Sequence, residues 1–218
     1  MQHRRAACLA LALFSCTFSQ AYPDTLAAPR WTRAVVQVYA GKNGGSGILF
    51  SASPGYVCTN SHVVGRAARA TVIWQDQQRR TGKVVWRDRL ADLAVVQVDA
   101  PRGAVSVELA TRDQAPRQGD TVHLAGYGIG GTHAGLNRPL TVWPAIVEGY
   151  VQDNTGRGRT QLQIATGAIS GDSGGGIIFN GRLCACLWGF TTSNGNKHTR
   201  GTVAEYLRKN FKGCAPNR

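Results

Sequence analysis

Short apolar segments recur along the chain, separated by glycine, asparagine, aspartate and proline. The segments are rich in valine and isoleucine, and patterns with the period of a helix are scarce, so the sequence predicts an all-β protein, a sandwich or a barrel. The expected strands form two groups: residues 34–39, 47–50, 56–59, 70–74, 82–86 and 93–98, and then residues 121–125, 142–151, 161–165, 176–179 and 183–190. Residues 101–119 are polar, contain Pro101 and Pro116, and are expected to form a linker between the groups.

The C-terminal segment predicts one amphipathic helix. Thr202 and Glu205 have the spacing of a capping box at a helix start, and Gly213 would stop the helix. The apolar residues that would share one face of this helix are Val203, Tyr206, Leu207 and Phe211.

Residues 1–21 have the features of a secretory signal peptide. Arg4 and Arg5 precede a short apolar core, and Ser19 and Ala21 are small residues at the two cleavage-site positions. The alternative is lipoprotein processing before Cys16, which we regard as the minor reading because Phe14 is bulky for that motif. We therefore expect an exported protein, periplasmic or extracellular, whose residues 22–33 form a loosely ordered leader.

The chain is strongly basic, with a formal charge of +13. Removal of residues 1–21 would leave +11, because that segment holds two arginines and no acid. The basic residues are spread through loops and form no nucleic-acid-binding motif, so we expect weak attraction to anionic surfaces and no specific nucleic acid partner. A protein that binds polyanions remains an alternative.

Four cysteines lie beyond the expected signal peptide: Cys58, Cys184, Cys186 and Cys214. In an exported chain they predict disulfide bonding, with three pairings open. Cys184 and Cys186 are two residues apart in an expected strand, so both should point to the same face and not bond each other. We favour Cys184 with Cys214, and a buried thiol for Cys58. A zinc site lacks a second ligand pair, so no metal or other cofactor is expected.

Three motifs together indicate a catalytic site that contains a serine, a histidine and an aspartate. Gly171-Asp172-Ser173-Gly174-Gly175 places a serine in a glycine-rich turn, a histidine lies at His62 after an apolar segment, and an aspartate lies at Asp92 before another. Each alone has an ordinary structural explanation. Their order, histidine, aspartate and then serine, is that of chymotrypsin and differs from that of the subtilisins and the α/β-hydrolases.

A serine hydroxyl needs a base to become a nucleophile at neutral pH. We assign Ser173 as the nucleophile, His62 as general base and acid, and Asp92 as the carboxylate that orients the imidazole. Asp88 is a rival for the carboxylate, but an apolar strand begins directly after Asp92. The backbone N–H groups of Gly171 and Ser173 are the expected oxyanion donors.

With these residues the chain resembles the chymotrypsin-fold serine proteases. Residues 45–49, 55–64 and 92–96 are similar to the protease domain of HtrA-type enzymes, and residues 187–189 with the closing helix resemble the glutamyl endopeptidases. The resemblance implies two packed six-stranded β-barrels, the first at residues 34–100 and the second within residues 120–218, which also include the C-terminal helix. It implies an endopeptidase that forms an acyl-enzyme. HtrA-type proteins carry a PDZ domain after the protease, and in this respect we expect the chain to depart from the family, because it ends too soon for one.

Asp172 departs from the HtrA-type pattern, which has asparagine there. In trypsin-like enzymes such an aspartate pairs with the N-terminal amine that activation creates.

The resemblance also implies a substrate pocket. Its walls would be Gly167, Ala168, Ile169, Ser170, Leu187, Trp188 and Gly189, with the strand near residues 195–199. No acid lies in these segments, so a preference for arginine or lysine is not expected. Leu187 replaces the histidine of glutamyl endopeptidases, which disfavours glutamate, although Lys197, His198 and Arg200 lie nearby and could supply positive charge. Small or medium apolar side chains are therefore the favoured expectation. We expect a monomer that acts on protein or peptide substrates; a non-catalytic peptide-binding protein on the same fold is the alternative.

Overall fold

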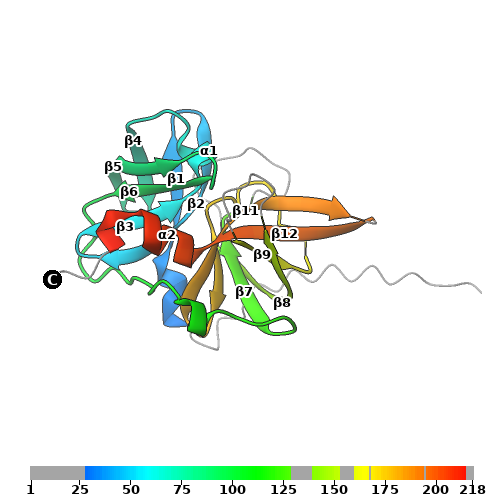
Figure 1. Ribbon diagram of the computed structural model, residues 1–218. Helices are drawn as coiled ribbons and strands as arrows, with labels where there is room; N and C mark the ends of the chain where they lie inside the picture. The colour runs from blue at the N-terminus through cyan, green and yellow to red at the C-terminus, as the bar shows by residue number, and fades with distance from the viewer. Residues whose placement is uncertain (1–27, 129–138, 153–159, 167, 194, 215–218) are drawn as a thin grey trace, which may run out of the picture.

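The computed structural model describes residues 28–128, 139–152, 160–166, 168–193 and 195–214. Two closed antiparallel barrels of six strands each make up most of this part of the chain (Figure 1), which confirms the all-β prediction. The first barrel has the strand order β1-β2-β3-β6-β5-β4. Its strands are β1 (Val35–Ala40), β2 (Asn43–Ala52), β3 (Gly55–Thr59), β4 (Arg69–Ile73), β5 (Arg79–Asp88) and β6 (Leu93–Gln97).

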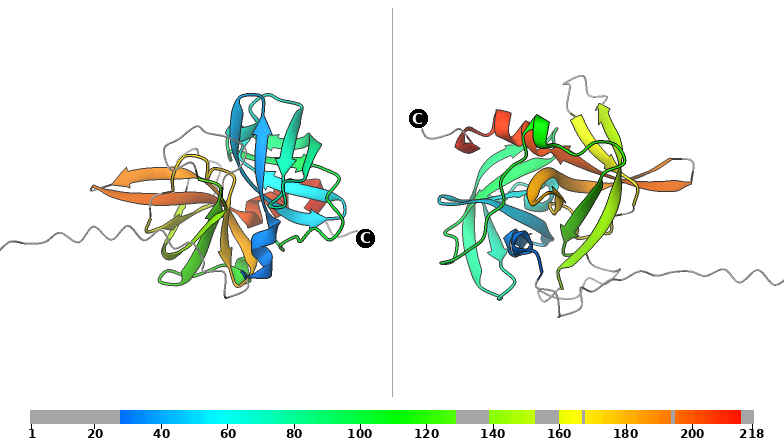
Figure 2. Two further views of the ribbon diagram at one scale, coloured as in Figure 1. Left: turned by 180° about the vertical axis from the view of Figure 1, so that it is seen from behind. Right: turned by 90° about the horizontal axis from the view of Figure 1, so that it is seen from below.

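The second barrel has the order β10-β11-β12-β9-β8-β7. Its strands are β7 (Thr121–Gly126), β8 (Thr141–Gln152), β9 (Thr160–Ile164), β10 (Gly176–Phe179), β11 (Arg182–Ser193) and β12 (Asn196–Val203). The long hairpin of β11 and β12 extends beyond the rest of the barrel (Figures 1 and 2). Its register pairs Phe190 with Thr199 and Ser193 with Asn196.

The predicted capping box at Thr202 is wrong. Thr202 is still in β12, and its hydroxyl donates to the Ala91 carbonyl at 2.9 Å instead of capping a helix. Helix α2 spans Ala204–Asn210 and is followed by the 3₁₀ turn η3 (Lys212–Cys214), so it ends before Gly213. The strand pairing of Thr202 with Gln161 of β9 determines its conformation, and local spacing cannot reveal such a partner.

Helix α2 returns from the second barrel to the first (Figure 2). Phe211, just after the helix, contacts the rings of Phe50, Tyr56 and Trp86 at centroid distances of 6.3, 5.0 and 6.1 Å. The main hydrophobic cluster accordingly contains buried residues from both barrels and from α2. No helix in the described ranges is long and apolar enough to cross a membrane.

The segment between the barrels packs more closely than a polar linker would. It contains the 3₁₀ turn η2 (Arg112–Gln114), while Val105 and Val107 are buried. Its backbone bonds to both barrels, because the Val107 N–H donates to Leu49 and the Ala110 N–H donates to Leu183. A second 3₁₀ turn, η1 (Arg30–Ala34), precedes β1.

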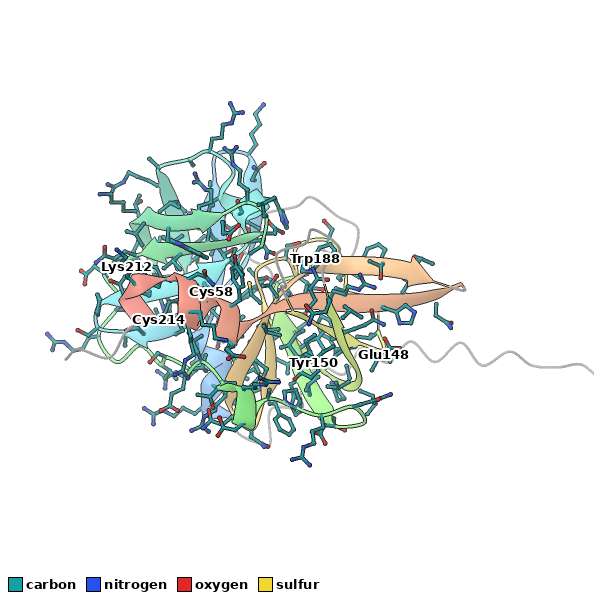
Figure 3. All side chains as sticks on the ribbon, viewed as in Figure 1. Cys58, Glu148, Tyr150, Trp188, Lys212 and Cys214 are labelled. Carbon is teal, nitrogen blue, oxygen red and sulfur yellow. The ribbon has the colours of Figure 1, made fainter. Side chains whose placement is uncertain are left out.

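The cysteines are free thiols in the described chain. Cys184 lies in the core of the second barrel, whereas Cys214 packs with Cys58 against the main cluster (Figure 3), so the favoured pairing of Cys184 with Cys214 is not formed. The expectation that Cys184 and Cys186 share a face is also wrong. The register of β10 and β11 shifts at Cys184, which makes it the extra residue of a β-bulge and breaks the alternation. Cys186 therefore points into the main cluster.

Candidate active site

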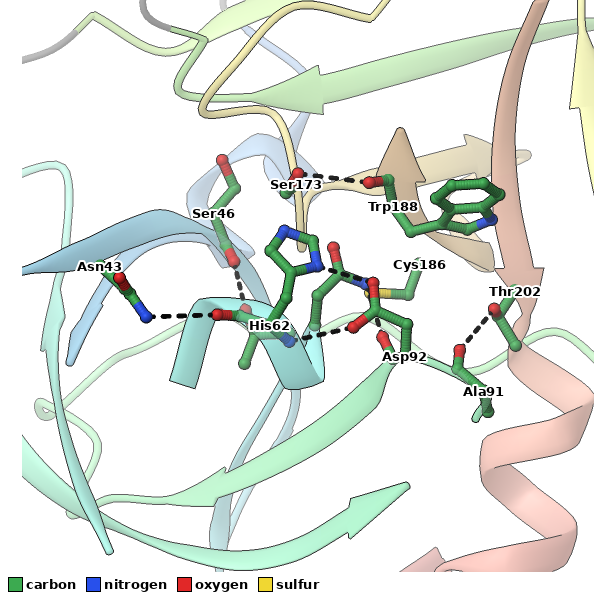
Figure 4. A network of polar contacts seen from close by, with 11 residues as sticks. Asn43, Ser46, His62, Ala91, Asp92, Ser173, Cys186, Trp188 and Thr202 are labelled. Carbon is green, nitrogen blue, oxygen red and sulfur yellow. Dashed lines mark hydrogen bonds and ion pairs between the residues drawn. The ribbon is translucent and has the colours of Figure 1, made fainter. Parts of the chain in front are cut away.

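His62 is carried by α1 (Ser61–Val64), a single turn that follows β3. The turn ends at Gly65, whose φ of +55° suits glycine and whose N–H donates to the Ser61 carbonyl. Asn43, in β2, donates to the His62 carbonyl at 3.5 Å (Figure 4). These contacts fix the backbone, while the His62 side chain stays half exposed.

The Asp92 carboxylate contacts His62 at two atoms, one in the side chain and one in the backbone. One carboxylate oxygen lies 2.7 Å from His62 Nδ1, and the other accepts the His62 backbone N–H at 2.9 Å (Figure 4). Asn60 donates to the Asp92 carbonyl at 2.8 Å, which helps to hold a residue whose φ is +50°. The predicted pair of His62 and Asp92 is therefore in direct contact, and the second ring nitrogen is left for another partner.

Asp88, the rival carboxylate, has a different place. It accepts the N–H groups of Leu90 and Ala91 at 2.8 and 2.9 Å and the hydroxyl of Tyr206 at 2.6 Å. Asp88 thus stabilises the loop that precedes Asp92 and connects this loop to α2 through Tyr206.

Ser173 lies in residues 171–175, which we call the nucleophile turn. The Asp172 N–H donates to the Ile169 carbonyl at 3.1 Å with Gly171 at φ +94°, which is the pattern of a type II turn with glycine at its third position. The N–H groups of Asp172, Gly174 and Gly175 are hydrogen-bonded. Those of Gly171 and Ser173 have no acceptor among the residues that the structure describes.

The Ser173 hydroxyl points to the Trp188 carbonyl at 3.3 Å (Figure 4). Within the described chain it makes no hydrogen bond to His62. Long or misaligned contacts of this kind are common in ligand-free active sites and tighten when substrate binds.

Asp172 is completely buried behind the turn. One carboxylate oxygen accepts the Ile169 N–H at 2.9 Å; the other faces Gly128 and has no hydrogen-bond partner of ordinary length. Burial raises the pKa of Asp172 to about 6, and the N–H groups of Ile169 and Gly128 oppose that rise. No basic side chain of the described ranges pairs with it.

The residues expected to line the substrate pocket differ in burial and in what their side chains contact. Leu187 is 1% exposed, packs in the core of the second barrel, and exchanges backbone hydrogen bonds with Gly174 and Gly175, so its side chain supports the site from behind. Ala168 is buried, while Ile169 and Ser170 are exposed. Gly167 lies outside the described residues.

Trp188 and Gly189 lie on the half-buried surface of β11. Trp188 is the extra residue where the register of β11 against β12 shifts, so it has no partner across that ladder.

The structure brings two further buried hydroxyl residues to the site. Thr199 ends the segment 195–199 that was expected near the pocket, although no role was assigned to its hydroxyl, whereas Ser46 was missed as a site residue. Thr199 donates to the Thr166 carbonyl and accepts the Ala168 N–H at 2.6 Å, which joins β12 to the segment before the nucleophile turn. Ser46 of β2 contacts the nucleophile turn from the first barrel. Its Gly-Ser-Gly sequence was visible as part of a family motif, but a buried hydroxyl has no sequence signal of its own. No group of three or more metal-ligating side chains occurs in the described residues.

Comparisons with known proteins indicate the family and the fold of the chain. A family model described as "Trypsin-like peptidase domain" matches residues 45–185. A protein of Haemophilus influenzae named "Probable periplasmic serine protease do/HhoA-like" is 32% identical over 147 residues, which are 64% of this chain and 29% of that protein. The chain therefore spans less than a third of the length of this relative.

Solved structures show the same fold. A serine endoprotease from Yersinia pestis superposes with a TM-score of 0.69 at 24% identity, over 85% of this chain and 64% of that one. The HtrA-type protease AlgW with a decapeptide gives a TM-score of 0.68 at 20% identity, over 83% of this chain and 64% of that one.

Proposed function

Because the chain belongs to the trypsin-like peptidase family, we propose that it is an exported serine endopeptidase that uses Ser173, His62 and Asp92. The observation that carries the proposal is the two-point contact of Asp92 with His62, at 2.7 and 2.9 Å, beside a serine in a glycine-rich turn. Peptide binding alone gives no reason to orient an imidazole in this way. The non-catalytic alternative is therefore the weaker explanation.

In the proposed reaction the Ser173 hydroxyl oxygen attacks the carbonyl carbon of the scissile bond. Nε2 of His62 takes the hydroxyl proton and passes it to the leaving amine, while Asp92 fixes the tautomer and stabilises the imidazolium. The acyl-enzyme is then hydrolysed by a water molecule that His62 activates in the same way. The negative oxygen of each tetrahedral intermediate would accept the free N–H groups of Gly171 and Ser173.

Substrate would bind as a strand along the edge of β11. β10 pairs with β11 only as far as Cys186, and Leu187 pairs with the nucleophile turn, so the edge beyond Leu187 is open to a further strand. The Trp188 carbonyl would accept the N–H of the residue before the scissile bond. This hydrogen bond from the substrate would replace the one that the Ser173 hydroxyl now donates to the Trp188 carbonyl. The Ser173 hydroxyl would then be free to rotate toward His62.

We expect the pocket to favour a small or medium apolar side chain before the scissile bond. The fully buried Thr199 hydroxyl donates to the Thr166 carbonyl and accepts the Ala168 N–H. It therefore joins β12 to the segment before the nucleophile turn, the two segments expected to form walls of the pocket. The described walls carry no acid that would pair with arginine or lysine. A long charged side chain would lose its hydration there without a partner.

Export is part of the proposal. The basic and apolar pattern of residues 1–21 supports it, and the H. influenzae relative is named as periplasmic. Cleavage after Ala21 would give a chain that begins at Tyr22.

A library of peptides tests the activity. The chain from Tyr22 and its Ser173→Ala variant are incubated with the same peptides, and cuts are located by mass spectrometry. We expect cuts after small or medium apolar residues with the first protein and none with the second. Equal cutting by both would exclude Ser173 as nucleophile, and a folded protein that cuts nothing would favour a peptide-binding role.

A further inference from the structure

Ser46 links the first barrel to the nucleophile turn of the second. Its N–H donates to the Ser173 carbonyl at 2.7 Å, and its hydroxyl donates to the Gly171 carbonyl at 2.8 Å. The hydroxyl also accepts the Tyr127 N–H at 2.8 Å, so it completes a bridge between two segments of the second barrel. Ser46 is fully buried, and Thr59 donates to its carbonyl at 2.7 Å.

Hydrogen bonds from Ser46 and from Gly175 hold the peptide units on the two sides of Ser173. A peptide unit is planar, so a fixed carbonyl also fixes the N–H on its other side. Ser46 fixes the carbonyls of Gly171 and Ser173, and the Gly175 N–H fixes the Asp172 carbonyl between them at 2.7 Å. The direction of the Ser173 N–H follows directly from the last of these.

The Gly171 N–H depends on Ser46 in another way. Gly171 has a φ of +94°, and glycine can leave this conformation at little steric cost. Its carbonyl is held by the Ser46 hydroxyl. Without that bond the peptide unit between Gly171 and Asp172 is held only by the hydrogen bond from the Asp172 N–H to the Ile169 carbonyl at 3.1 Å. Gly171 can then change conformation more readily, and its N–H can turn away from the reacting carbonyl.

The packing leaves little freedom elsewhere. A Cβ placed on Gly174 would lie 2.0 Å from the Ser46 carbonyl oxygen, and one on Gly45 would lie 2.6 Å from the Ser173 carbonyl oxygen. The two backbones are therefore in direct contact, and β2 serves as the surface against which the nucleophile turn is set.

We propose that Ser46 is a positioning residue, whose hydroxyl holds Gly171 of the nucleophile turn in the conformation that presents the Gly171 N–H as an oxyanion donor. The inference rests on the proposed peptidase function for its kinetic consequence. Its structural consequence, a locked nucleophile turn, can be measured without turnover.

The kinetic test compares Ser46→Ala and Ser46→Cys with the control Thr32→Val. Thr32 is also buried and donates one hydroxyl hydrogen bond, to Pro29 at 2.8 Å, but it lies in η1. Loss of one oxyanion donor costs on the order of 10²–10³ in rate, so a turn that presents it only part of the time should lower kcat about 10- to 100-fold. We expect that loss in Ser46→Ala with KM within about threefold, an intermediate kcat in Ser46→Cys because a thiol is a weaker donor, and no change in Thr32→Val.

The second test uses amide hydrogen exchange in a Ser173→Ala background, with and without Ser46→Ala. We expect exchange in residues 169–175 to become about tenfold faster or more, while β1 and β7 are unchanged. Unchanged exchange in that segment overturns the proposal, as does an equal kinetic loss in Thr32→Val. If the parent protein cuts no peptide but exchange responds as expected, the peptidase function fails and the positioning role stands.

Discussion

Asp172→Asn should stabilise the protein at neutral pH. The pKa of the buried carboxyl is raised from 3.8 to about 6, because burial disfavours its charged form. Between these two values the unfolded chain releases a proton that the folded chain keeps, so stability falls as pH rises through this window and stays low above it. At about 1.4 kcal/mol per pH unit, ionisation of Asp172 costs the folded state on the order of 3 kcal/mol at pH 7.5.

Asparagine removes this cost but cannot replace every contact. Its amide oxygen can still accept the Ile169 N–H, which now donates at 2.9 Å, while its amino group meets the backbone of Gly128. We therefore expect a net gain of about 1–2 kcal/mol. For a chain of this size that gain raises Tm by roughly 2–8 °C.

Thermal unfolding by circular dichroism measures the effect. Both proteins carry Ser173→Ala to prevent self-digestion, and exposed Asp99→Asn is the matched control. The difference between Asp172 and its asparagine variant should be full at pH 7.5 and should shrink toward pH 4. An asparagine variant that is less stable at pH 7.5, or a difference that grows as pH falls, would refute the reasoning.

Three further changes test other parts of the site and fold. Asp92→Asn should lower kcat about 10⁴-fold without unfolding, because His62 loses the carboxylate that sets its tautomer; peptide cleavage checks this, and a variant that keeps a tenth of the activity would exclude the role. Gly174→Ala should lower the free energy of unfolding by at least about 3 kcal/mol, because its Cβ would lie 2.0 Å from the Ser46 carbonyl oxygen. Urea unfolding measures this loss, and a midpoint near that of the parent protein would contradict the close contact. Phe211→Ala should cost about 3–4 kcal/mol by removing a buried ring, which the same urea assay measures; a loss below about 1 kcal/mol would contradict its place in the core.

Much of the fold could be predicted because hydrophobic pattern reflects burial. The six strands of the first barrel were expected within a few residues of their observed ends. Turn residues bound these strands, and most of the strands are rich in buried apolar residues, at nearly every position in β1 and β6. Short apolar segments of this kind are the signal that a single sequence carries best.

The errors came from tertiary contacts. Thr202 matches a capping box, yet its hydroxyl bonds to Ala91, a residue far away in the chain. Cys184 and Cys186 obey strict alternation only if the strand is regular, and the bulge at Cys184 depends on the register with β10. Neither feature has a local signal.

The candidate site was predictable in part. Motif order named His62, Asp92 and Ser173, and the structure brings the first two into contact. The segment 195–199 was expected at the pocket, but the role of the Thr199 hydroxyl and the place of Ser46 in the site could not be predicted, because a serine or threonine inside a strand is common. Only the fold shows which carbonyl its hydroxyl reaches.

The most direct test of the account is labelling by a fluorophosphonate, which reacts with an activated serine. The chain from Tyr22, His62→Ala and Ser173→Ala are treated in parallel, and the site of modification is mapped by peptide mass spectrometry. We expect one adduct, on Ser173, that forms far more slowly in His62→Ala and not at all in Ser173→Ala. A folded protein that takes no label, or one that takes it on another residue, would contradict the assignment of Ser173 as a nucleophile activated by His62.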